Sequence, residues 1–148
     1  MSIQEQIDYD LKQAMKEKNA DKLAALRAVK SAIMLEITKS PDVLITDEVS
    51  LNIIARLVKQ RKDAAAIFIE QNRQDLADEE IIQSSYLEGY LPVQLDEDEV
   101  RKIVKEVILY VGALSLADIS KCMKILMKRL NGKADGALIS RLVREQLS

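Results

Sequence analysis

The chain has 148 residues, of which 48% are hydrophobic and 31% charged, and 22 basic against 24 acidic side chains give a net charge of −2. This balance excludes an extended disordered chain, and no apolar run approaches the ~20 residues of a membrane-spanning helix. Histidine is absent and Cys122 is the single cysteine, which excludes an internal disulfide and a Ser–His–Asp or Cys–His catalytic site.

The residue composition also limits the chemistry that the protein can perform and indicates its location. Without histidine, one cysteine and scattered carboxylates argue against a zinc site. We therefore expect no catalytic residue, no metal and no cofactor. The N-terminal residues 1–6 are polar and carry no signal-peptide pattern, so we expect a cytoplasmic protein.

Apolar residues recur every three or four positions along the chain, which predicts an all-α fold with four helices followed by three shorter ones. The first helix covers about 3–17, and a polar break at 18–21 precedes the second. Pro41 ends the second helix, because proline disfavours helical geometry in the residue before it. The third begins at Thr46 or Asp47 and runs to about Asn72. A fourth opens at the acidic residues 75–80. The predicted inner faces include Met15, Ile37, Ile69 and Ile82.

Pro92 marks the expected boundary between an N-terminal helical domain, 1–91, and a C-terminal three-helix domain, 96–148. Asp96 with Glu99 three residues later is typical of a helix start. Gly112 suits a left-handed C-terminal cap of that helix. The sixth helix is expected to start at residues 115–118 and to close at Gly132, and Asp135 suits the cap of the seventh.

Charge is distributed unevenly. Residues 75–99 contain nine acids and no base, whereas residues 119–148 contain seven bases and two acids. Lys121, Lys124 and Lys128 share one helix face, and Lys133 precedes a helix N-terminus that suits a phosphate. The sequence predicts a nucleic-acid-binding surface made of six cations: Lys121, Lys124, Lys128, Lys133, Arg141 and Arg144.

Two interpretations of these cations stay open. They could bind an RNA backbone, or they could form a solvent-exposed face that binds no partner. No aromatic residue is interleaved with them, which favours recognition of shape and phosphate over base stacking.

A second charged cluster lies between the third and fourth helices. Arg61 falls close to the apolar stripe, where a guanidinium needs a carboxylate such as Asp63 or Asp75. We expect structural ion pairs, in preference to a ligand site, among four residues: Arg61, Asp63, Arg73 and Asp75.

Several blocks of the sequence resemble the YqeY-like protein family, in order and spacing, over almost the whole chain. They are DLKQAMK at 10–16, Leu26-Arg27, KQRKD at 59–63, RQDLA at 73–77, YLPVQL at 90–95 and GKADG at 132–136. The chain departs from the family at residues 64–66, which are alanines where a serine is frequent. Lys128 stands where proline is frequent.

The resemblance implies a two-part helical fold whose C-terminal part is similar to the tail domain of the tRNA-dependent amidotransferase B subunit. That tail helps to hold tRNA, and the chemistry lies in other domains. We therefore expect a non-catalytic accessory protein that binds tRNA or a tRNA-associated complex. One alternative is a protein-interaction module that docks a partner through its helical faces or residues 75–99. Another is a component of a carbon–nitrogen ligase that uses glutamine as amido donor.

Overall fold

The computed structural model describes all residues from 1 to 148, and it confirms the predicted all-α fold. Seven α-helices and one 3-10 turn follow one another along the chain: α1 (Ile3–Glu17), α2 (Ala20–Lys39), α3 (Asp47–Glu70), α4 (Gln74–Glu88), α5 (Glu97–Val111), η1 (Leu116–Asp118), α6 (Ile119–Arg129) and α7 (Gly136–Leu147). The chain divides into two compact units, Met1–Leu91 and Pro92–Ser148. Each unit has its own hydrophobic core.

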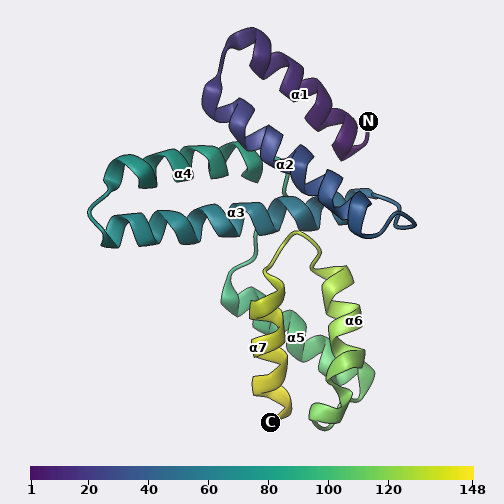
Figure 1. Cartoon of the computed structure of the whole chain (residues 1–148). Helices are drawn as coiled ribbons and strands as arrows, with labels where there is room; N and C mark the ends of the chain where they lie inside the picture. Colours follow the sequence, from purple (N-terminus) through teal and green to yellow (C-terminus); the bar gives the residue numbers. More distant parts are fainter. The chain divides into compact units, whose positions relative to one another are not determined.

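In the first unit, α3 and α4 form an antiparallel helical hairpin, and α2 packs against both of its helices (Figure 1). The core of this unit includes Ile7 of α1, Leu26 of α2, Ile54 of α3 and Leu87 of α4, all fully buried. Two hydrogen bonds join the end of α4 and the residues after it to α1 and to the start of α2. Tyr90 Oη donates to Asp10, and Asn19 Nδ2 donates to Tyr86 Oη at 3.1 Å.

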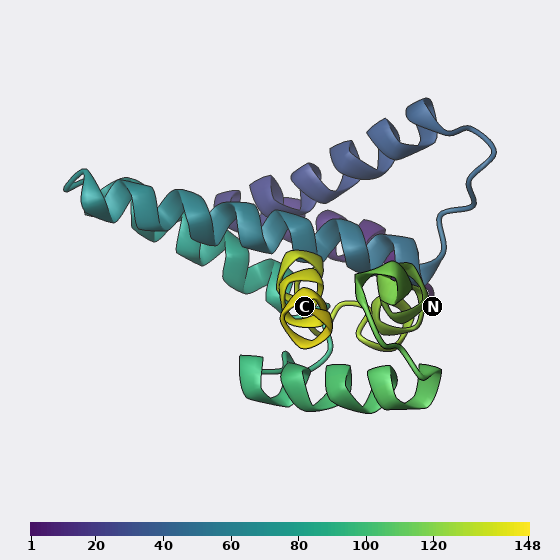
Figure 2. The ribbon, with the colours of Figure 1, turned by 90° about the horizontal axis from the view of Figure 1, so that it is seen from below.

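In the second unit, α6 and α7 run antiparallel side by side, and α5 crosses both of them (Figure 2). Val104 of α5, Leu126 of α6 and Leu142 of α7 are fully buried at the centre of this core. The segment before α5 is tied to the α6–α7 loop, because Leu95 N donates to Lys133 O at 2.9 Å. None of the helices combines the length and the apolar character that crossing a bilayer requires.

Local capping chemistry explains where several helices begin and end. Asp96 accepts a hydrogen bond from Glu99 N at 2.8 Å, and Thr46 accepts one from Val49 N at 3.3 Å, which confirms both predicted N-caps. Gly112 adopts φ 73° after α5, as predicted for a left-handed C-cap. Asp135 occupies the N-cap position of α7, but its side chain makes no capping hydrogen bond, contrary to the prediction.

Four apolar residues of the predicted inner faces are exposed instead of buried. Met15 is 54% exposed, Ile37 40%, Ile69 49% and Ile82 43%. These side chains follow the apolar periodicity of their helices, but no neighbouring helix covers them, so they are exposed to solvent. The sixth helix also starts later than predicted. Residues 116–118 form a 3-10 turn, in which Asp118 accepts a hydrogen bond from Leu114 N at 3.0 Å.

Candidate nucleic-acid interface

The outer face of α6 carries a row of lysines. Cys122 and Leu126 are fully buried on one side of this helix, and residues three or four apart share a helix face. Lys121, Lys124 and Lys128 are therefore opposite the core, and all three are exposed. Lys121 lies 3.8 Å from Asp118, with 71% of its side chain exposed. Lys124 and Lys128 form no ion pair.

Arg141 is less available than these lysines to bind a phosphate, because carboxylates of the same chain contact it. Its guanidinium contacts Glu97 of α5 and Glu145 of α7, the latter at 2.9 Å. Arg101 of α5 joins the same network through Glu97 at 3.5 Å and Asp98 at 3.1 Å. The hydrogen bond from Arg141 is the main cause that lowers the pKa of Glu97. This network neutralises Arg141 and links α5 to α7.

Arg144 and Lys133 keep uncompensated charges. Both are exposed, and neither forms an ion pair. The six predicted residues are therefore not one set of equivalent cations. The structure separates Arg141, which is paired, from four that have no ionic partner: Lys124, Lys128, Lys133 and Arg144. These four and the weakly paired Lys121 come from α6, the α6–α7 loop and α7, and we call this set of five cations the basic surface.

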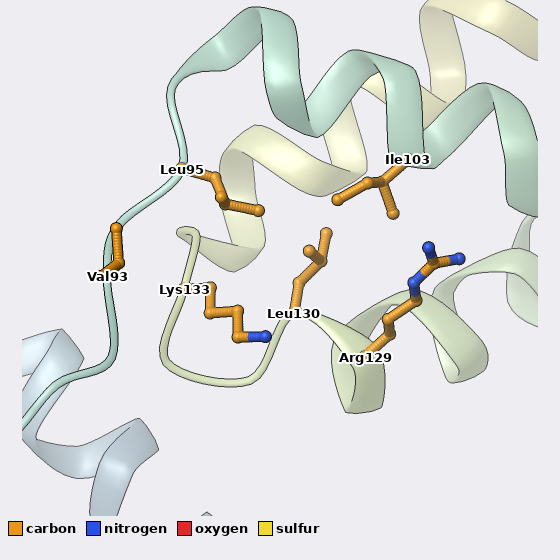
Figure 3. Close-up of a pocket in the computed structure, with 6 residues that line it drawn as sticks. All are labelled: Val93, Leu95, Ile103, Arg129, Leu130 and Lys133. Atoms are coloured by element: carbon orange, nitrogen blue, oxygen red, sulfur yellow. The ribbon is translucent and has the colours of Figure 1, made fainter.

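Lys133 lies at the rim of a pocket of about 500 Å³ in the second unit (Figure 3). Leu95, Ile103 and Leu130 form its apolar wall, and Arg129 extends from the end of α6 beside them. Arg129 also pairs with Glu106 of α5 at 3.1 Å. The sequence did not single out Arg129, because its partner is on another helix.

An exposed aromatic residue lies close to α6, where the sequence indicated none. Tyr110 of α5 is 86% exposed and lines a second pocket of about 360 Å³ with Glu106, Val107, Ile125 and Arg129. The stripe Val100, Val104 and Val107 could have revealed it, since Tyr110 falls outside that stripe and therefore outside the core face.

The second predicted cluster, in the first unit, forms only in part. Arg73 donates two hydrogen bonds to Asp75, at 3.1 and 3.2 Å, and this contact lowers the pKa of Asp75. Arg61 instead donates to the amide oxygen of Gln83 at 3.3 Å, not to Asp63 or Asp75. Because Arg61 is only partly buried, water and a neutral amide suffice to solvate its charge.

Other reactive groups lie in structural settings. Cys122 is fully buried, and burial raises the pKa of its thiol. Burial is also the first cause that raises the pKa of Tyr90, followed by its hydrogen bond to Asp10. No group of three or more Cys, Asp or Glu side chains is placed to hold a metal ion.

Comparison with known proteins gives one family and several relatives. The family model described as YqeY-like protein matches residues 4–147. Altered inheritance of mitochondria protein 41, mitochondrial, of Kluyveromyces lactis is 33% identical over 102 residues, covering 67% of this chain and 55% of that protein. The protein of the same name from Pyrenophora tritici-repentis is 28% identical over 145 residues, covering 94% of this chain and 77% of the relative. The chain thus spans little more than half of the first relative.

The relatives contradict the expected cytoplasmic location, because each is named a mitochondrial protein. The prediction was wrong because it rested on one cysteine and on a missing signal-peptide pattern. A single cysteine does not distinguish among the compartments that keep thiols reduced.

Proposed function

Because the chain belongs to the YqeY-like protein family, and because its C-terminal unit displays unpaired lysines on one helix face, we propose that it binds tRNA through the basic surface without catalysing a reaction itself. The observation that carries this proposal is the absence of ionic partners at Lys124 and Lys128, opposite the buried Cys122 and Leu126. Lysines without partners gain most from phosphate contact, since their binding releases counterions from the nucleic acid.

The chemistry of the unit supports phosphate recognition in particular. Three acids of the second unit are engaged by arginines: Glu97 and Glu145 pair with Arg141, and Glu106 pairs with Arg129. They therefore do little to offset the field of the lysine row. The resemblance of this part of the chain to the tail of a tRNA-dependent amidotransferase subunit supports tRNA as the substrate class.

Charge reversal on the lysine row tests the proposal. Lys124→Glu with Lys128→Glu should weaken tRNA binding roughly tenfold at physiological salt and reduce the salt slope by about 2, one for each lost phosphate contact. Filter binding of purified chain to tRNA over a salt series measures both quantities.

Lys102→Glu with Lys105→Glu is the matched control, because it changes the net charge equally. Both lysines are exposed on α5, on the side away from the buried Val104. The control should change affinity and slope much less. Equal weakening of tRNA binding by the two double variants would show a general effect of net charge. If Lys124→Glu with Lys128→Glu does not weaken tRNA binding, the proposal that α6 contacts tRNA is contradicted.

A second candidate function is protein docking by the α3–α4 hairpin of the first unit. Four isoleucines are exposed there: Ile67 52%, Ile69 49%, Ile81 45% and Ile82 43%. The neighbouring Glu79 and Glu80 form no ion pair, so an apolar partner helix with basic residues would complement this hairpin. Crosslinking from Ile81 in lysate treated with nuclease would recover such a protein, whereas the tRNA proposal predicts crosslinks from α6 that nuclease removes.

A further inference from the structure

We propose that the pocket between Tyr110 and Ile125 holds an unstacked base of the RNA whose backbone contacts α6. This inference rests on the proposed function and adds a mode of recognition to it. The basic surface by itself would hold any phosphate chain. A base-binding pocket beside it would favour RNA that presents an unpaired nucleotide over fully paired RNA.

The pocket has the size and the walls that a base requires. Its volume is about 360 Å³, within the ~300–1,000 Å³ of small-molecule sites. Tyr110 supplies an aromatic wall that is 86% exposed and is free to receive a stacked ring. Ile125 of α6, 37% exposed, and Val107 supply apolar contacts around it. Stacking on an aromatic side chain is the usual way in which proteins hold single-stranded bases.

The pocket continues the lysine row. Ile125 follows Lys121 by four residues and precedes Lys128 by three, so both lysines neighbour it on the α6 surface. A phosphate bound by these lysines is therefore close to the pocket mouth. The distance from a backbone phosphate to its own base is short, so one nucleotide could contact a lysine and Tyr110 together.

The rim carries groups suited to base edges. Arg129 and Glu106 both line the pocket and pair with each other at 3.1 Å, with half or more of each side chain exposed. A guanidinium can stack on a base, and a carboxylate accepts hydrogen bonds from exocyclic amino groups. The cations around Ile125 favour a nucleotide over an apolar side chain of a protein partner, because a nucleotide brings the complementary charge.

Two RNAs and two variants test the proposal. The full chain is titrated with a hairpin RNA that has a single-stranded loop and with a blunt duplex of equal nucleotide number. Tyr110→Ala should weaken hairpin binding about 5- to 150-fold, the range for loss of one base–aromatic stack, and change duplex binding less than twofold. Leu109→Ala is the control: Leu109 is 81% exposed on the same helix but does not line the pocket.

A fluorescent variant reports the stack directly. The chain has no tryptophan, so Tyr110→Trp creates a single indole in the pocket wall. Its emission should be quenched by the hairpin and not by the duplex. Tyr110→Phe, which keeps the ring, should bind the hairpin as tightly as the unchanged protein.

The possible failures are distinguishable. If Lys124→Glu with Lys128→Glu weakens RNA binding but Tyr110→Ala does not, the basic surface stands and the base pocket is overturned. That result is also the one expected if the pocket takes an apolar side chain of a protein. If no RNA binds and the lysine variants change nothing, the proposed function fails, and the pocket inference fails with it. Equal loss of hairpin and duplex binding in Tyr110→Ala also overturns the inference.

Discussion

Arg141 and Arg144 are three residues apart on α7, yet their surroundings differ. Arg141 contacts two carboxylates, whereas Arg144 is exposed without an ionic partner. A guanidinium that is already paired must give up its partners before it can meet a phosphate. The sequence predicted both arginines as members of one binding surface. It could not reveal the ion pair of Arg141, because the partner Glu97 is 44 residues away along the chain.

This difference predicts different effects of two similar substitutions. Arg144→Ala should reduce the salt slope of tRNA binding by about 1, as expected for one lost phosphate contact. Arg141→Ala should leave the slope nearly unchanged and instead loosen the contact between α5 and α7. The same filter-binding series measures the slope, and urea unfolding of both variants measures the second effect. A larger loss of slope in Arg141→Ala than in Arg144→Ala would contradict the assignment.

Ser50 predicts a substitution that does not destabilise the fold. It is fully buried on α3, and its Oγ is the one buried side-chain polar atom without a hydrogen-bond partner. Burial of such a group costs free energy, and alanine favours the helix more than serine. Ser50→Ala should therefore leave the free energy of unfolding unchanged or raise it by about 1 kcal/mol.

Ser84 provides the matched comparison in the same urea titration. It is buried too, but its Oγ donates to Ile81 O at 2.9 Å. Ser84→Ala removes a hydrogen bond that is made, so Ser50→Ala should be the more stable variant of the two. The opposite order would show that Ser50 contributes an interaction that its surroundings do not reveal.

At the scale of the elements, the sequence predicted features that depend on nearby residues, and it did not predict features that depend on contacts between helices. The caps at Thr46, Asp96 and Gly112 depend on residues within one helical turn, so the sequence predicted them. The exposure of Ile69 and Ile82 depends on whether another helix lies alongside, which periodicity does not encode. The amide partner of Arg61 was missed for the same reason, since it depends on packing between helices. The exposure of Tyr110 is different, because the valine stripe of α5 already leaves Tyr110 outside the core face.

The start of α5 predicts an acid response. The hydrogen bond from Glu99 N is the main cause that lowers the pKa of Asp96 below its ordinary 3.8. A carboxyl with a lowered pKa stabilises the fold above its ordinary pKa, and this contribution is lost as pH falls through the lowered value. Asp118 and Glu97, whose pKa values are also lowered, act in the same direction.

We therefore expect the urea midpoint of the second unit to fall as pH is lowered from about 5 to about 3. Asp96→Asn keeps a capping side chain but has no charge to lose, so its midpoint should depend less on pH. Residue-resolved measurement is needed to separate this unit from the other. An acid response in Asp96→Asn as steep as in the unchanged protein would assign the effect to the other carboxyls.

At the scale of the whole molecule, the chain contains two cores that share no residue. Leu26 belongs to the first and Leu126 to the second, and both are fully buried. Leu126→Ala should destabilise the second unit by about 2–5 kcal/mol and leave hydrogen exchange in the first unit unchanged, and Leu26→Ala should do the reverse. Loss of protection in both units from either substitution would show that they unfold together.

The most direct test of the central claim is a titration of the full chain with tRNA at physiological salt, in which solution NMR records the backbone amide chemical shifts. The proposed function predicts that the largest shift changes cluster in α6, the loop to Lys133 and the turn around Arg144, and that they disappear in Lys124→Glu with Lys128→Glu. Shift changes confined to the first unit, or none at all, would contradict the claim that the lysine row of α6 is an RNA-binding surface.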